Sequence, residues 1–469
     1  MTPQDDALRC ELLLAREAIN RSLGNRQSRE HDLRELQQSQ TFSADSQTRC
    51  RVLERLANLR QETGDRRGEH EAIRALGEQA NSLADDHWKA VVFELSARYQ
   101  TSIGSYGDAR TASMSAAALY ERLGEVAGQI NALGVACQTA AYLFDFAAAA
   151  EGLNRMDELA RHSEAANLVA LAARTRAIVA IKRQDYEAGQ AAAVVALELH
   201  RSIGDRYGEA SGHALLGVLA GAMWRIDGAR RHYAFACGLF ETLGNPHGLG
   251  QASMNAAGLE ADLGCFDEAR RLAERACALA ETAGEIPLLE IYTTNMASLA
   301  LSSGDYALCL KICQGAKELS DDMVSLARLA LAAQAEVMLG DFGAAIETLE
   351  KVIPEFRRYN FFSAAYDALI FLTQAYLATA KFDDAWRCVD DLLHEMTALG
   401  EVYPRMYRPR VLWLAGRACA ATNQVERARE MYREAQNVLE EMRTAIPDEE
   451  TRACFSAVPF HLEIDAAFV

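Results

Sequence analysis

Histidine side chains come first among the residues that could do chemistry, because imidazole binds metals and transfers protons near neutral pH. The ten histidines are dispersed along the chain. Three of them, His200, His213 and His232, fall on successive stretches of helical pattern. No H-E-x-x-H or similar ligand pair accompanies them. The pattern therefore favours surface or packing histidines and predicts no metal site.

Cysteines are the second candidates, since thiolates bind metals and form disulfides. The eleven cysteines are mostly single residues within helical patterns. Cys309 and Cys313 can share one helical face, but no further ligand lies nearby in sequence. An odd number is a poor match to a disulfide framework and fits reduced thiols in the cytoplasm. We expect buried cysteines without a metal.

Adjacent carboxylates are the remaining candidates for acid–base chemistry. Four such pairs occur: Asp85-Asp86, Asp321-Asp322, Asp383-Asp384 and Asp390-Asp391. They fall at expected helix starts or on exposed faces, where the helix dipole or water favours a carboxylate. Catalysis assembled from distant parts of the chain needs no local motif and stays open. The sequence predicts no catalytic residue and no cofactor.

A period of 40 residues identifies the elements that must position any site. A bulky residue recurs at Tyr106, Phe146, Tyr186, Ile226, Phe266 and Tyr306, and a small residue three places later at Ala109, Ala149, Gly189, Ala229, Ala269 and Cys309. Gly104, Gly264 and Gly304 stand two places before this ladder. A fixed period of this length is typical of a solenoid of stacked units, each too small to bury its apolar face alone.

One repeat, from Asn245 to Gly284, reads as a helical hairpin. Two apolar stripes at helical spacing are separated by Gly264. Asn245 suits an N-cap and Pro246 the first helical position. Gly264 can adopt the left-handed conformation that ends the first helix, and Phe266 then opens the second. Ala269 lies one turn later, where a small side chain lets the two helices approach closely.

Turn positions of this kind occur at 24, 64, 104, 144, 184, 224, 264, 304, 340, 380 and 423, which predicts eleven hairpins, about 22 helices and no strands. We expect a capping hairpin at 1–44, whose polar second helix suits a solvent-facing cap, and regular repeats at 45–320. Repeats with altered spacing follow at 321–445, and a capping segment at 446–469. The slip from 40 to 36 residues after Tyr306 could open a pocket or a hinge near Asp321. The aromatic residues that follow it favour packing between repeats over a recognition site.

Composition narrows the class of protein further. No stretch reaches the about 18 apolar residues that a membrane span needs. Asp5 and Asp6 stand where a secretory signal would be positive, which favours a soluble, cytoplasmic protein. The net charge of −18 repels phosphates, so we expect neither direct nucleic-acid binding nor a membrane.

The turn sequences Gly264-x-Phe266-x-x-Ala269, Gly304-Asp305-Tyr306 and Gly340-Asp341-Phe342-x-x-Ala345 resemble the tetratricopeptide repeat. The long repeat is similar to the arm of bacterial signal-transducing regulators related to the maltose activator MalT. This resemblance implies an all-α solenoid, a right-handed superhelix of about eleven hairpins with a concave groove lined by the first helix of each. In those regulators a P-loop ATPase precedes the arm, but no G-x-x-x-x-G-K-[ST] occurs here.

The resemblance also implies which positions face the groove: those thirteen, ten, nine, six, three and two places before the turn residue. The candidate ligand-binding residues at these positions are Glu94, Arg98, Asn131, Gln138, Tyr142, Arg174, Asn255, Asn295, Gln334, Gln374 and Trp413, with Glu54, Asn58, Arg410 and Arg417 at further such positions. Amides suit the backbone of an extended peptide or a polar small molecule. The alternative is that Asn255 and Asn295 bond neighbouring helices within the stack.

These observations favour a non-catalytic regulatory or adaptor protein that binds a peptide, a protein segment or a small-molecule inducer in the groove. One alternative is the ligand-sensing arm of an NTPase-type transcriptional regulator. Another is an unusual enzyme, or enzyme partner, that encloses its substrate; a deep pocket with a desolvated histidine or carboxylate would favour it. The apolar segment from Ala453 to Val469 can fold back as a cap or dock a second copy in a homodimer.

Overall fold

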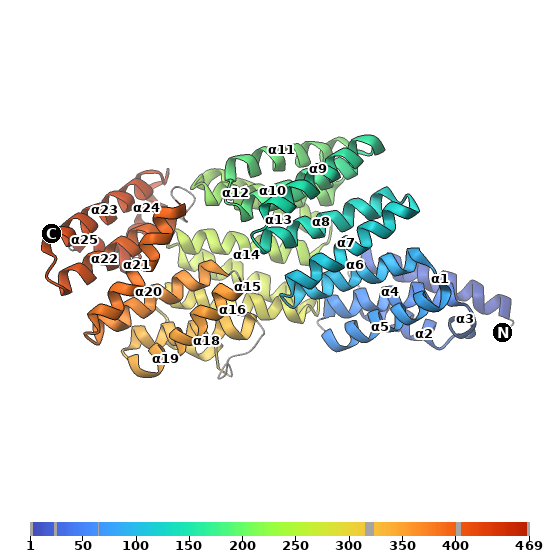
Figure 1. Cartoon of the computed structure of the whole chain (residues 1–469), viewed down its shortest axis with the longest axis horizontal. Coiled ribbons are helices and arrows are strands. Elements are labelled where there is room, and N and C mark those ends of the chain that lie inside the picture. Colours follow the sequence, from blue (N-terminus) through green and yellow to red (C-terminus); the bar gives the residue numbers. More distant parts are fainter. Residues whose placement is uncertain are drawn as a thin grey trace. The chain divides into compact units, whose positions relative to one another are not determined.

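The computed structural model describes residues 3–22, 26–63, 65–314, 323–359, 361–399 and 405–466. Every regular element within these ranges is a helix, and Figure 1 shows the helices succeeding one another along the chain. The predicted all-α array is thus confirmed for the part of the chain that the structure describes. The suggested hinge at Asp321 lies outside the described residues.

The first half of the chain contains α1 (Pro3–Ser22), α2 (Arg26–Gln37), α3 (Gln40–Ala44), α4 (Ser46–Thr63), α5 (Arg66–Leu83), α6 (Asp86–Ser102), α7 (Tyr106–Leu123), α8 (Val126–Tyr142), α9 (Phe146–Ser163), α10 (Ala166–Lys182), α11 (Tyr186–Ser202), α12 (Arg206–Ala222) and α13 (Ile226–Thr242). The second half contains α14 (Pro246–Asp262), α15 (Phe266–Thr282), α16 (Ile286–Ser302), α17 (Tyr306–Ile312), α18 (Met323–Leu339), α19 (Phe342–Arg358), α20 (Phe362–Ala378), α21 (Phe382–Leu399), η2 (Arg405–Tyr407), α22 (Arg408–Ala421), α23 (Val425–Thr444), α24 (Glu449–Ser456) and α25 (Pro459–Ala466). The described residues form 25 α-helices, and the three beyond the predicted 22 are the short α3 and the two helices after α23.

Left-handed backbone at the predicted turn positions separates the two helices of each hairpin. Positive φ angles occur at Gly104 (77°), Phe144 (59°), Gln184 (60°), Trp224 (57°), Gly264 (73°), Gly304 (85°), Gly340 (89°), Ala380 (58°) and Asn423 (63°). The first two predicted positions, 24 and 64, lie outside the described residues. Five of these nine turns use a residue with a side chain in a conformation that favours glycine. The turn position is therefore kept even where the glycine is absent.

Polar N-caps fix where helices begin. The Asn245 side chain accepts a hydrogen bond from the Gly248 amide at 2.7 Å, as predicted for the hairpin from Asn245 to Gly284. Asp145 and Asp185 accept equivalent bonds at the starts of α9 and α11. Each cap satisfies an amide that has no partner inside the helix. Residues next to each boundary therefore determine where these helices begin.

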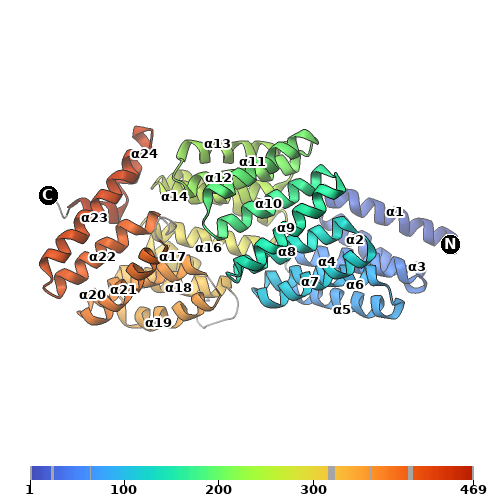
Figure 2. The same cartoon turned by 45° about the horizontal axis from the view of Figure 1, so that its top comes forward.

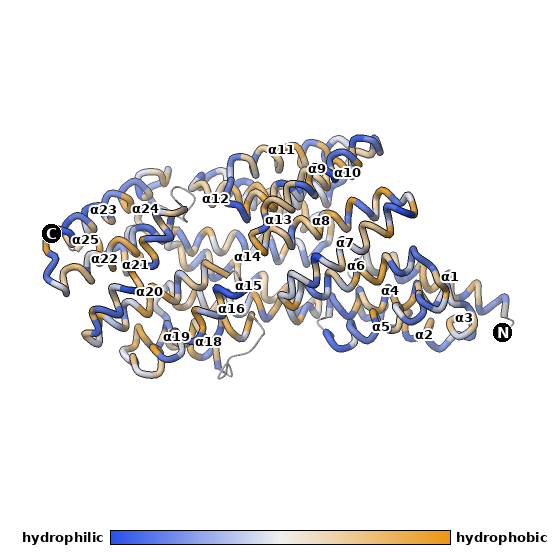
Figure 3. The backbone as a smooth tube through the Cα atoms, in the orientation of Figure 1, coloured by the Kyte–Doolittle hydropathy of each residue, from blue (hydrophilic) through white to orange (hydrophobic). Residues whose placement is uncertain are grey.

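The ladder of small residues lies where the two helices of a hairpin meet. Ala109, Ala149, Ala229, Ala269 and Cys309 are completely buried. A larger side chain at these sites would have to displace tightly packed neighbours. Each helix otherwise carries apolar residues among hydrophilic ones, as the mixed colours in Figure 3 show. Successive helices such as α18, α19 and α20 pack against one another in this way (Figure 2).

The chain forms two compact units that share the middle helices. Unit 1 comprises Met1–Leu219, Ala234–Gln251 and Ala278–Leu289, and unit 2 comprises Ala220–Tyr233, Ala252–Cys277 and Glu290–Val469. No described helix is both long enough and apolar enough to cross a lipid bilayer.

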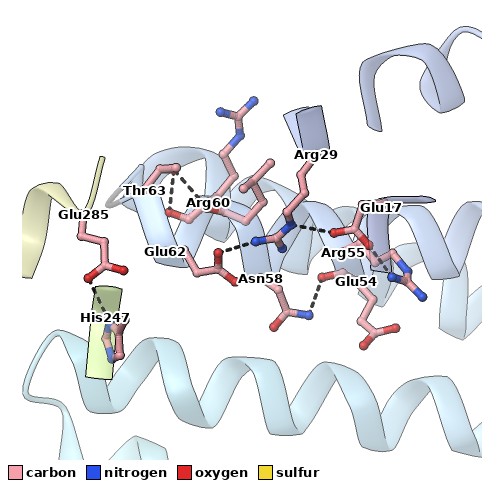
Figure 4. A network of polar contacts seen from close by, with 11 residues as sticks. Glu17, Arg29, Glu54, Arg55, Asn58, Arg60, Glu62, Thr63, His247 and Glu285 are labelled. Atoms are coloured by element: carbon pink, nitrogen blue, oxygen red, sulfur yellow. Dashed lines mark hydrogen bonds and ion pairs between the residues drawn. The ribbon is translucent and has the colours of Figure 1, made fainter. Parts of the chain in front are cut away.

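Unit 1 contains a buried network of charges near its first hairpin (Figure 4). Arg29 of α2 donates from Nε to Glu17 of α1 at 2.8 Å and from Nη1 to Glu62 of α4 at 2.5 Å. Glu17 also pairs with Arg55. The polar second helix of this hairpin was expected to face solvent, but Arg29 and Asp32 are buried. Their charges are tolerated because each has a partner of opposite sign.

In unit 2 the C-terminal segment, 446–466, turns back onto helices that precede it by about 200 residues. Trp224 donates from Nε1 to the Met442 carbonyl at 3.0 Å, and its ring contacts Phe455. Arg230 donates to Thr451 at 3.0 Å. Helices α22 and α23 lie side by side, with α25 against α23 (Figure 1). The segment therefore packs within its own chain; docking of a second copy stays a prediction.

Candidate ligand-binding site

A cavity of about 400 Å³ lies within unit 2. Its walls come mainly from the first helices of successive hairpins, α14, α16, α18, α20 and α22, which we call the first-helix face. The remaining wall belongs to the C-terminal segment, with Phe455, Phe460 and His461 among the lining residues. Ligand pockets commonly have volumes of roughly 300–1,000 Å³. The cavity is thus large enough for a small molecule or a short stretch of peptide.

Amide side chains form one polar part of this cavity. Asn295 of α16, Gln334 of α18 and Gln374 of α20 all line it. Asn295 is exposed, whereas Gln334 is buried. The three come from the predicted ligand-binding residues, and successive hairpins bring them to one place. An amide both donates and accepts, so the set can bond peptide groups in either direction.

Arg410 of α22 is the cation of the cavity. Its Nη2 donates to Gln374 Oε1 at 3.3 Å. The guanidinium lies over the rings of Phe371 at 4.5 Å and Phe460 at 5.4 Å. Burial lowers the pKa of Arg410, and the charge of Asp367 opposes this effect. Buried Nε has no hydrogen-bond partner, so one donor remains available.

Two carboxyl groups share the cavity with Arg410. Asp262 is the last residue of α14, and Asp367 belongs to α20. Burial, together with the charge of Asp367, raises the pKa of Asp262 to about 7. Asp262 is an exposed residue of the cavity wall, so water reaches its carboxyl group. Burial raises the pKa of Asp367 to about 6, while Arg410 and a 3.1 Å hydrogen bond from Tyr407 act in the opposite direction.

The C-terminal wall is held in place by its own contacts. Burial lowers the pKa of His461 to about 4, so its imidazole is neutral at pH 7. Because the Phe455 carbonyl can only accept, His461 Nδ1 donates to it, at 2.5 Å. The Phe455 and His461 rings also lie 4.2 Å apart. This local bonding positions Phe460 beside Arg410.

Three predicted residues of unit 1 bond neighbouring helices instead of an open groove. Arg98 donates to Asn58, 40 residues upstream, at 2.9 Å. Glu94 accepts from the Tyr120 hydroxyl at 3.0 Å. The ring of Tyr142 stacks on Tyr106 at 4.6 Å and receives the ammonium of Lys182 at 4.2 Å. These contacts stabilise the stack of repeats, so a ligand would have to compete with them.

The other predicted residues lie apart from the cavity. Asn131 is exposed, and Gln138 and Arg174 are half-buried in unit 1. Asn255 is half-buried in unit 2 and is not part of the cavity wall. Trp413 packs against Tyr432 of α23, with the ring centres 4.8 Å apart. The structure therefore brings together three of the eleven candidates and leaves the others dispersed.

Asp262 and Asp367 were missed among the sequence candidates. Both stand at positions implied for the groove: Asp262 is two places before Gly264, and Asp367 thirteen places before Ala380. The same rule includes Arg410. Phe460 and His461 carry no such signal, because they lie beyond the last repeat.

The described histidines and cysteines that were first considered for chemistry make separate local contacts. Within the described ranges no group of three histidine, cysteine, aspartate or glutamate side chains could hold a metal ion. His200 pairs with Asp205 at 2.8 Å, and Arg201 contacts His213 at 2.9 Å. Cys309 is buried and contacts the Leu331 carbonyl at 3.6 Å.

Repeated hairpins with left-handed turns define an α-helical repeat protein. No protein-family model and no curated sequence matches the chain. Among solved structures, NprR in complex with its cognate peptide NprX is similar to it, with 16% identity and a TM-score of 0.49 over 73% of this chain and 99% of that one. A Rap protein complexed with competence and sporulation factor has 12% identity and a TM-score of 0.40 over 81% and 98%.

A third similar structure is a signal transduction ATPase with a tetratricopeptide repeat sensor from Pyrococcus horikoshii. It has 12% identity and a TM-score of 0.43, over 74% of this chain and 55% of that one. At these levels the similarities assign no ligand to this chain. Its ligand has to be argued from the cavity.

Proposed function

We propose that this chain is a non-catalytic regulatory or adaptor protein that binds a peptide segment in the unit 2 cavity. The observation that carries the proposal is the gathering of Asn295, Gln334, Gln374 and Arg410 on one apolar-lined cavity of the first-helix face. Such a wall offers hydrogen bonds along a backbone and apolar contacts for side chains.

The C-terminal segment gives binding a route to a response. Phe455, Phe460 and His461 lie in the cavity wall, while Asp448 and Thr451 of the same segment contact Arg230. A ligand that contacts Phe460 therefore acts on a segment that also touches α13. A ligand changes conformation only to the extent that it binds one arrangement better than another. We infer that the position of this segment reports occupancy to a partner.

The test is selection of peptides from a displayed random library with the full chain, followed by calorimetry on the best peptide. Asn295→Ala removes an exposed cavity amide without disturbing the core. We expect it to weaken binding about tenfold, the effect of one lost hydrogen bond. Asn131→Ala is the matched control, an exposed asparagine of unit 1, and should leave affinity unchanged. Equal effects of the two substitutions, or failure to enrich any peptide, would contradict the proposal.

A second candidate function is catalysis, because two carboxyl groups with raised pKa values share the cavity. Asp262, with a pKa of about 7, has the proton affinity expected of a general acid or base near neutral pH. Mass spectrometry of the selected peptide after prolonged incubation with the chain distinguishes the two functions. Binding alone returns the peptide intact, whereas a product formed by the wild-type chain and not by Asp262→Asn would favour catalysis.

A further inference from the structure

We propose that the unit 2 cavity recognises a cationic group, a primary amine or a guanidinium, carried on an apolar body. Asp262 and Asp367 would pair with the cation, and the aromatic wall would hold the rest of the ligand. This inference rests on the proposed function, since it specifies the chemistry of the ligand that occupies the same cavity.

Charge balance is the first observation. Three acidic side chains line the cavity, those of Asp262, Asp367 and Glu463, against the single guanidinium of Arg410. His461 is neutral at pH 7 because its pKa is lowered to about 4. The cavity therefore carries an excess of negative charge that one ligand cation would offset. An anionic group on the ligand would instead be repelled by the acidic side chains.

The state of Asp262 is the second observation. No arginine, lysine or histidine forms an ion pair with its carboxylate among the described residues. Its pKa is raised by burial and by the charge of Asp367. Arg410, by contrast, is already engaged by Gln374 and by the rings of Phe371 and Phe460. Asp262 thus has no cation beside it, whereas Arg410 is largely engaged, and an unpaired carboxylate favours a cationic ligand group.

The aromatic wall is the third observation. Phe266, Tyr306, Phe361, Phe371, Tyr407 and Phe460 line the cavity. Ring faces attract cations within about 6 Å and also bury apolar groups. A lysine or arginine side chain has both parts, an apolar stem and a charged end. A peptide with a basic residue between apolar residues fits this combination.

The anionic alternative starts from Arg410. Its Nε has no partner, so a ligand carboxylate could bond there. Asp367 lies close enough to influence the pKa of Arg410, and so does Glu463. Both would repel such a ligand, and we therefore favour the cation.

The test measures binding of three capped tripeptides, N-acetyl-Phe-X-Phe-amide with X as Lys, Gln or Glu, to the full chain by calorimetry. We expect the Lys peptide to bind at least tenfold more tightly than the Gln peptide, and the Glu peptide most weakly. Asp262→Asn should reduce the difference between the Lys and Gln peptides, because only Asp367 then remains to pair with the cation. Asp390→Asn, which alters an exposed carboxylate of α21, is the matched control and should preserve the difference.

A second readout is proton release. Pairing with a cation lowers the pKa of Asp262, so at pH 6.5 the Lys peptide should release protons, seen as a dependence of the binding enthalpy on the buffer. Asp262→Asn should reduce that dependence. Equal binding of the Lys and Gln peptides would overturn the cation preference but leave the proposed function in place. Tightest binding of the Glu peptide would have the same consequence. Absence of binding by all three at millimolar concentration would contradict both.

Discussion

Asp262 and Asp367 line one cavity from helices α14 and α20, and the charge of Asp367 raises the pKa of Asp262. More than a hundred residues separate them in sequence. Two neighbouring carboxyl groups disfavour each other's ionisation, because their charges have the same sign. The fold therefore loses stability when both are ionised, and the dependence of stability on pH measures this loss.

The pH dependence of stability follows from these two groups. Their pKa values, about 7 for Asp262 and about 6 for Asp367, exceed the usual aspartate value of 3.8. The folded chain therefore holds more protons than the unfolded chain between about pH 4 and pH 7. The contribution of each group to stability is complete below pH 4 and is lost as the pH rises through its folded value.

Asp262→Asn should therefore raise the midpoint of urea unfolding at pH 8 and reduce the loss of stability between pH 5 and pH 8. The control Asp390→Asn should not change that slope. A lower midpoint for Asp262→Asn at pH 8 would show that ionised Asp262 has a stabilising partner within the fold.

Gly264 tests how the C-terminal segment is attached. Its φ is +73°, and a Cβ placed there would lie 2.6 Å from the carbonyl oxygen of Cys454. Gly264→Ala should cost about 1–2 kcal/mol for the left-handed backbone and about 1–3 kcal/mol more for the clash. Gly304, with φ +85° and open space around it, is the matched control. Gly304→Ala should show the backbone cost alone.

Limited proteolysis separates these effects. Cleavage between 446 and 466 should become faster in Gly264→Ala and remain unchanged in Gly304→Ala. Equal protection in both variants would argue that the contact with Cys454 contributes nothing to holding the segment.

Arg230 joins α13 to α14 and to the C-terminal segment. It donates to both oxygens of Glu260, at 2.7 and 2.6 Å, and Glu260 is buried. Arg230→Met leaves that carboxylate without its cation, which should lower the free energy of unfolding by about 2 kcal/mol. Arg231→Met, at an exposed neighbour, should change it by less than about 0.5 kcal/mol. Chemical denaturation at pH 7 checks both, and indistinguishable variants would contradict the account.

Substitution of Arg29 tests a buried ion pair of unit 1 in the same way. Its side chain is 2% exposed, and that of its partner Glu17 is fully buried. Arg29→Met should destabilise the first hairpin by about 3 kcal/mol, because buried Glu17 then loses one of the two arginines that pair with it among the described residues. Hydrogen exchange of α1 and α2 should accelerate accordingly. The exposed pair of Arg67 and Glu71 supplies the control, since Arg67→Met should cost below about 1 kcal/mol.

The hairpins could be predicted from the sequence because their signals are local. Asn245, Pro246 and Gly264 each act within one turn of helix, and the structure places each as expected. Even Phe144 and Trp224, which lack the glycine, were located by the 40-residue period. The 40-residue interval determines where each turn lies, and the packing of the neighbouring helices offsets the cost of its left-handed backbone.

The cavity could be predicted only in part. The resemblance to the tetratricopeptide repeat implied that Asn295, Gln334 and Gln374 face one groove, and each belongs to a first helix. It could not place Phe460 and His461, which lie beyond the last repeat in a segment whose Phe455 contacts the distant Trp224. Nor could it show that Arg98 and Tyr142 bond their neighbours. A repeat rule assigns a face, whereas the choice between a ligand and a neighbouring helix is made by packing.

Hydrogen exchange of the full chain, with and without the selected peptide, tests the central claim most directly. The account predicts slower exchange in α16, α18, α20 and α22 and in the C-terminal segment, with unit 1 helices such as α6 and α8 unchanged. Protection confined to unit 1, or to second helices such as α19 and α21, would contradict it.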